Sequence, residues 1–218
     1  MVLVALAITS WSALGVGSAA AQPAVHPAFA DAVAQVAGSA FPGPILVPST
    51  SATFFDPLLT RQNPASQGDT GTDGWRAPGV PMYELRVGVL GGDAPLVIVD
   101  GYAGRSAFVA TFTRGINEEE CDPAAPYCAY TPFIAGPPTE ELIDGLVVGG
   151  QPAAARHQTC CNGETWAVGW YDARADVSYS LTLSFSMADQ LGARGVDADH
   201  VAAAQRLADV ANALVAAP

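Results

Sequence analysis

Residues 165–171 read Thr-Trp-Ala-Val-Gly-Trp-Tyr, and residues 177–186 read Val-Ser-Tyr-Ser-Leu-Thr-Leu-Ser-Phe-Ser. In the second stretch apolar residues alternate with hydroxyl-bearing ones, which predicts a strand with one buried face and one solvent-facing hydroxyl face. The first stretch places Trp166, Val168 and Trp170 on one face. Because residues 172–176 between them form a short polar turn, we expect an antiparallel hairpin.

Two helices are expected at the ends of the mature chain. Residues 27–37 combine helix-forming residues with a Pro at the start, and Gly38 follows as a stop signal. Near the C-terminus, Asp197 or Asp199 can cap a second helix. Its apolar residues recur every three or four positions, as one face of an amphipathic helix does: Val201, Ala204, Leu207, Ala211, Leu214 and Val215.

Short apolar runs between these helices predict the rest of the sheet. The expected strands are 45–47, 83–89, 95–99, 106–113 and 145–150, with a single helical turn at 139–142. Residues 49–81 are rich in Pro, Gly and polar residues and are expected to form a long loop. Strands in succession with helices at the ends predict an α+β fold: an antiparallel β-sheet with an N-terminal helix and a C-terminal amphipathic helix packed on it.

The charge balance excludes several classes of protein. The 218-residue chain has 21 acidic residues against 9 basic ones, a formal net charge of −12, and every basic residue is Arg. Binding of nucleic acid or of an anionic membrane needs clustered cations, so neither partner is expected. The absence of Lys excludes Schiff-base chemistry and phosphate-binding loops of the P-loop type.

The first 21 residues carry an export pattern. They form an apolar stretch that ends in Ala19-Ala20-Ala21, which predicts a secretory signal peptide (1–21) cleaved after Ala21. The alternative is a retained membrane anchor, since the stretch is about one span long. With cleavage, residues 22–218 form a single α+β domain with no membrane span, and we expect a secreted or periplasmic protein.

The four cysteines agree with export. Cys121, Cys128, Cys160 and Cys161 are an even number, and oxidising compartments favour disulfides, so two disulfides are expected. Three pairings are possible, and the sequence leaves the choice open. A metal site formed by these thiolates with His157 is the alternative, but their spacing matches no standard zinc pattern. We therefore expect no metal and no cofactor.

Candidate site residues are few. No nucleophile motif is present, and the single Asp69-Thr70-Gly71 triplet lacks the second carboxylate that an aspartic protease needs, so no catalytic residue is assigned. Trp75 is a large apolar ring in the expected loop and is a candidate for ligand contact. His157 is the second candidate, beside the acidic cysteine loop, whereas His200 is interpreted as a surface residue in the first turn of the C-terminal helix.

The order of elements from Val147 to Val215 resembles a known group of proteins. A Val-Val-Gly-Gly strand, a cysteine-bearing loop, the tryptophan strand, the hydroxyl strand and a final Ala- and Leu-rich helix are similar to exported bacterial domains of unknown function, found in lipoproteins and in the extracytoplasmic parts of anti-sigma and sporulation proteins. The resemblance implies an α+β domain outside the membrane. We expect a non-catalytic module that binds a protein, a small molecule or a cell-envelope component; an exported hydrolase is the alternative.

Overall fold

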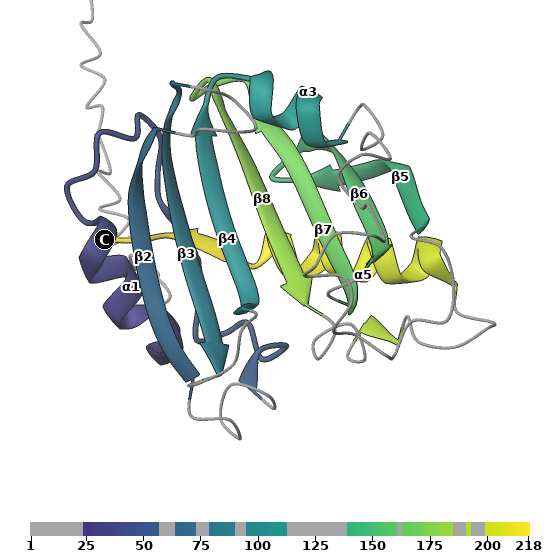
Figure 1. Cartoon of the computed structure of the whole chain (residues 1–218), viewed down its shortest axis with the longest axis horizontal. Helices are drawn as coiled ribbons and strands as arrows, with labels where there is room; N and C mark the ends of the chain where they lie inside the picture. Colours follow the sequence, from purple (N-terminus) through teal and green to yellow (C-terminus); the bar gives the residue numbers. More distant parts are fainter. Residues whose placement is uncertain are drawn as a thin grey trace, which may run out of the picture.

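A seven-stranded antiparallel sheet forms the centre of the molecule, with the strand order β2-β3-β4-β8-β7-β6-β5 (Figure 1). The computed structural model describes residues 24–56, 64–72, 79–89, 95–112, 139–160, 163–184, 191–192 and 199–218. Its strands are β2 (Pro64–Thr72), β3 (Pro81–Val89), β4 (Pro95–Ala103), β5 (Thr139–Val148), β6 (Gln151–Cys160), β7 (Gly163–Asp172) and β8 (Val177–Ser184). The fold is therefore α+β, as predicted.

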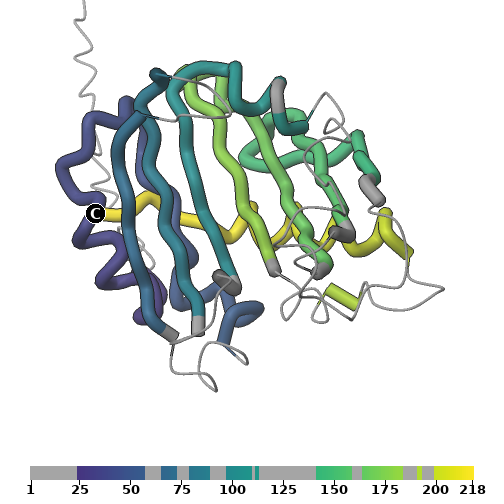
Figure 2. The backbone as a smooth tube through the Cα atoms, viewed as in Figure 1, coloured from purple at the N-terminus to yellow at the C-terminus, as the bar shows by residue number. Residues whose placement is uncertain are grey.

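One face of the sheet carries the main hydrophobic core. Helix α1 (Ala30–Val36), preceded by the 3-10 turn η1 (Pro27–Phe29), covers β2 and β3, and helix α5 (His200–Asn212) crosses β5, β6 and β7. A short ribbon of β1 (Leu46–Pro48) and β9 (Leu214–Ala216) pairs an early described segment with the last one, and Figure 2 shows the yellow C-terminal segment extending in this view to the side of the molecule where the purple N-terminal segment lies. The expected packing of both terminal helices on the sheet is confirmed.

The predicted hairpin is formed by β7 and β8. Trp166 lies opposite Leu183 and Trp170 opposite Tyr179, and all four side chains are buried in the core. The turn between the strands contains Asp176 at a φ of 53°, a left-handed conformation that Asp tolerates better than most residues. Alternation of apolar residues thus predicted both the pairing and the buried face of these strands.

The opposite face of the hairpin differs from the prediction. Ser178 and Ser180 are buried rather than facing solvent: Ser178 donates a hydrogen bond to the Gly104 carbonyl oxygen (2.6 Å), and Ser180 donates to the Asp100 carboxylate. The cover comes from helix α3 (Ser106–Phe112), which packs on β7 and β8. A strand was expected at 106–113, so that prediction was wrong.

Three further predictions are corrected by the strands. The expected loop at 49–81 contains β2, a polar edge strand that pairs with β3 along its whole length. The expected helical turn at 139–142 belongs to β5, which pairs with β6. The C-terminal helix ends at Asn212, so Leu214 and Val215 belong to β9, and Val201 is 63% exposed rather than in the apolar stripe. Asp199 caps α5, as expected.

Helix α1 lies unusually close to β2 at Gly68. A Cβ atom at Gly68 would lie 2.2 Å from the carbonyl oxygen of Ala32 in α1 and 2.8 Å from a methyl group of Val36. A backbone oxygen cannot rotate away as a side chain can. The close contact between helix and strand therefore depends on the missing side chain at this position.

Replacing Gly68 with Ala is expected to lower the free energy of unfolding by about 1–3 kcal/mol, the usual cost of overpacking. Gly71→Ala is the matched control, because it lies on the same strand and an added Cβ there meets nothing within 4 Å. Urea unfolding of the two variants checks this. Equal stability of both variants would show that α1 does not sit on β2 in this way.

Tyr83 connects the sheet to the β1–β9 ribbon. Its hydroxyl group accepts a hydrogen bond from the Leu46 amide (2.9 Å) and donates one to the Leu46 carbonyl oxygen (3.4 Å). The ring is fully buried. Burial raises the pKa of Tyr83 well above its usual value, because the core disfavours a phenolate.

We expect the folded state to lose stability as the pH rises above about 10, where tyrosines in the unfolded chain begin to ionise. The unfolded state then releases a proton that folded Tyr83 keeps, so the free energy of unfolding falls by up to about 1.4 kcal/mol per pH unit for this group. Denaturant unfolding between pH 9 and 11.5 measures the slope. Tyr83→Phe should unfold more easily at pH 7 and show a shallower alkaline slope; an unchanged slope contradicts the assignment.

Candidate functional site

A row of three side chains crosses adjacent strands at one end of the core face. Glu141 on β5 lies directly opposite His157 on β6, and His157 lies directly opposite Trp166 on β7. Directly opposed residues of antiparallel strands project on the same side of the sheet and are close enough to touch. The imidazole ring of His157 stacks on the Trp166 indole, with 4.3 Å between ring centroids and 18° between planes.

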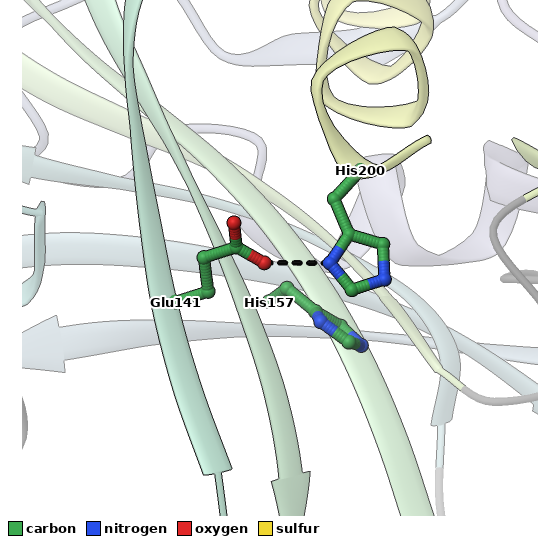
Figure 3. Close-up of side chains that lie close together, drawn as sticks. All are labelled: Glu141, His157 and His200. Carbon is green, nitrogen blue, oxygen red and sulfur yellow. Dashed lines mark hydrogen bonds and ion pairs between the residues drawn. The ribbon is translucent and has the colours of Figure 1, made fainter. Parts of the chain in front are cut away.

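Helix α5 places a second histidine over this row. His200 is the first residue of α5, and the Asp199 carboxylate caps the helix by accepting a hydrogen bond from the Ala202 amide (3.0 Å). The His200 ring meets the His157 ring edge-on at 4.6 Å between centroids. Its Nδ1 donates a hydrogen bond to the Glu141 carboxylate (2.6 Å), the contact drawn in Figure 3.

A second carboxylate holds His157 from the other side. Glu164 lies two residues before Trp166 on β7, so both side chains project from the same face. One oxygen, Oε1 of Glu164, accepts hydrogen bonds from Nε2 of His157 (3.0 Å) and from the indole N–H of Trp166 (3.0 Å). Because Trp166 has no solvent exposure, its N–H needs a protein acceptor, and Glu164 supplies it.

The solvent exposure of the side chains increases from one end of the cluster to the other. The side chains of His157 and Glu164 are 9% and 13% exposed, whereas those of His200 and Glu141 are 33% and 47% exposed. An ion or small molecule therefore meets Glu141 and His200 first, and His157 forms the inner wall.

Glu141, His157 and His200 together can act as a set of metal ligands. Each offers one donor atom, and the three donor atoms lie within 4.8 Å of one another. Ligands of a tetrahedral zinc ion are about 3.3 Å apart, given metal–ligand distances of about 2.0 Å.

The structure brings only part of the expected site together. His157 lies in the cluster, and its role in ligand contact stays a prediction. His200 is the first residue of α5 and its side chain is 33% exposed, as expected, and it also contacts His157 and Glu141, which the sequence did not indicate. Trp75 lies outside the described residues.

The disulfide prediction falls outside the described side chains. Cys121, Cys128 and Cys161 are not among the described residues, and of Cys160 only the backbone, at the end of β6, is described. The expectation of two disulfides and its three possible pairings therefore stays a prediction.

The sequence-based interpretation missed the two carboxylates and considered a metal site for His157 only together with the cysteines, so it expected no metal. It weighed His157 against the cysteines, whereas the structure places it with Glu141, Glu164 and His200. The missing signal was strand register. Glu141 joins the cluster only because β5 is a strand paired with β6.

Other candidate positions in the described part of the chain lack this combination of groups. His26 lies apart from the cluster, where its Nδ1 accepts from the Ala28 amide at the start of η1 and its Nε2 contacts Asp56 at 3.1 Å. An open cavity of about 440 Å³ beside α5 contains no histidine. It is lined by Ser51, Ala52, Thr53, Phe54, Arg206, Asp209, Val210 and Ala213.

Comparison with family models, with curated proteins and with solved structures gives no match. None of the helices among the described residues has the length and apolar character needed to cross a membrane.

Proposed function

We propose that this protein is a non-catalytic, extracytoplasmic binding module, and that Glu141, His157 and His200 bind a divalent transition-metal ion of the zinc type. One observation carries the proposal: two imidazoles and a carboxylate from three separate elements converge within 4.8 Å. These are nitrogen and oxygen donors of the kind that zinc takes in proteins.

The donor set favours one class of ion. Imidazole nitrogens suit Zn²⁺, Cu²⁺, Ni²⁺ and Co²⁺, whereas Ca²⁺ and Mg²⁺ take oxygen ligands almost exclusively. Two histidines with one carboxylate is a donor set that zinc accepts at tetrahedral sites. The net charge of −12 adds a negative field that attracts cations to the surface.

Export is the second part of this proposal. Its support is the apolar, Ala-rich segment 1–21 and the even number of cysteines. The resemblance of residues 147–215 to exported bacterial domains points the same way. A secreted or periplasmic module with an ion site near its surface fits metal capture or metal-dependent contact with the cell envelope.

Calorimetric titration of the tag-free, non-reduced chain with Zn²⁺ tests the proposal. We expect one ion per chain. His157→Ala and His200→Ala should each weaken binding by more than about 100-fold, because loss of a ligand exceeds the 10–100-fold effect of losing a ligand's hydrogen-bond partner. Circular dichroism establishes that each variant is folded.

Two control variants make this titration specific. His26→Asn removes a histidine outside the cluster and keeps an acceptor at the helix cap, so it should bind Zn²⁺ like the parent chain. Asp144→Asn removes one exposed carboxylate of β5 and controls for general attraction of cations. The proposal fails if the parent chain binds no Zn²⁺, or if the cluster variants bind as tightly as the controls.

An exported hydrolase is the second candidate, and one observation favours it. The Glu164 carboxylate holds the His157 imidazole at 3.0 Å, as carboxylates orient histidines that act as general bases. Turnover of a simple ester such as p-nitrophenyl acetate, lost in His157→Ala and retained in His26→Asn, would favour the enzyme. Equal background rates in all three proteins would favour the binding module.

A further inference from the structure

We infer that Glu164 is a positioning residue that determines which nitrogen of His157 binds the ion: Nε2 stays protonated on Glu164, and Nδ1 is the metal ligand. This inference rests on the proposed metal site and assigns its inner ligand atom. It also gives the Glu164–Trp166 pair, which does not belong to the ligand set, a role in affinity.

The hydrogen bonds of Glu164 assign the proton on His157. A carboxylate oxygen only accepts hydrogen bonds, so the 3.0 Å contact between Oε1 of Glu164 and Nε2 of His157 requires a proton on Nε2. A neutral imidazole has one protonated nitrogen, which leaves the lone pair on Nδ1. Metal ions bind the nitrogen that carries the lone pair.

Trp166 keeps Glu164 in this position. Its indole N–H donates to the same Oε1 atom at 3.0 Å, and its ring stacks on the imidazole at 4.3 Å. One buried tryptophan therefore fixes both the acceptor and the plane of the histidine ring. The imidazole cannot turn over to present Nε2 without losing the hydrogen bond to Glu164.

This arrangement has a consequence for affinity. A carboxylate that accepts the second N–H of a ligating histidine fixes the orientation of the ring and makes the other nitrogen a better donor, and removing such a partner weakens metal binding by about 10–100-fold. Gln at position 164 still offers an acceptor oxygen but no charge, whereas Ala offers neither. We expect Zn²⁺ affinity to fall in the order parent, Glu164→Gln, Glu164→Ala.

Long-range proton–nitrogen NMR of the histidine side chains tests the assignment directly, because nitrogen shifts distinguish a protonated, a free and a metal-bound ring nitrogen. In the Zn²⁺-loaded parent chain, His157 should show a bound Nδ1 and a protonated Nε2. Glu164→Gln should keep this pattern with weaker binding. Glu164→Ala should mix the two modes of coordination, which a purely structural role of Glu164 would not produce.

Asp144→Asn is the matched control for the loss of one negative charge, and its affinity should equal that of the parent. Coordination of His157 through Nε2 in the parent, or unchanged affinity in Glu164→Ala, overturns this inference while leaving the metal site intact. Absence of any Zn²⁺-induced shift in the histidines of the parent overturns the metal site itself. The two failures are therefore distinguishable in one set of spectra.

Discussion

The indole N–H of Trp166 is the polar group on which this end of the molecule depends. The side chain is fully buried between β6, β7 and α5, and a buried N–H without an acceptor costs about 1–3 kcal/mol. Glu164 satisfies it, and in doing so places a carboxylate at the margin of the hydrophobic core. That carboxylate needs a further donor, and Nε2 of His157 provides it. The polar cluster is therefore a continuation of the core and not an addition to its surface.

This origin explains the order of burial across the site. Trp166 and His157 are stacked and enclosed, whereas Glu141 and His200 lie at the edge strand and at the start of a helix, where solvent reaches them. Binding sites need a rigid part that fixes geometry and an accessible part that admits the ligand. Here the hydrophobic sheet supplies the first, and the junction of β5 with α5 supplies the second.

The sequence predicted the parts of the fold where local pattern and tertiary packing agree. The β7–β8 hairpin has a strict alternation of apolar and polar residues in β8 and a polar turn, and in the structure the two strands pair as this pattern predicts. Helix α5 has a periodic apolar stripe and a capping Asp199. Prediction failed where strand pairing outweighs the local preference for a helix. Thr-Glu-Glu at 139–141 has the composition of a helix start, yet it lies in β5 and pairs with β6.

The other errors concern strand β2, at the edge of the sheet, and helix α3, which packs on one of its faces. Strand β2 is polar and contains glycines, a composition typical of loops, but an edge strand tolerates polar residues on its exposed side. The short apolar stretch of α3 fits a strand or a helix equally well by pattern.

The candidate site was beyond sequence analysis for a related reason. Its members come from four elements, β5, β6, β7 and α5, and the distance between Glu141 and His200 along the chain is 59 residues. Only the register of β5 against β6 and of β6 against β7 reveals that Glu141, His157 and Trp166 form one row. A shift of one residue in either pairing would turn a member of the row to the opposite face.

The β1–β9 ribbon has a consequence for the order in which the molecule is assembled. Leu46 pairs with Ala216 and Pro48 with Leu214, so one of the earliest described segments finds its partner at the far end of the chain. Long loops close late in folding, because closing them costs conformational entropy before the strand pairing contributes any favourable free energy. The growing chain can build hairpins such as β7–β8 during synthesis, but it cannot complete its fold until residue 216 is free.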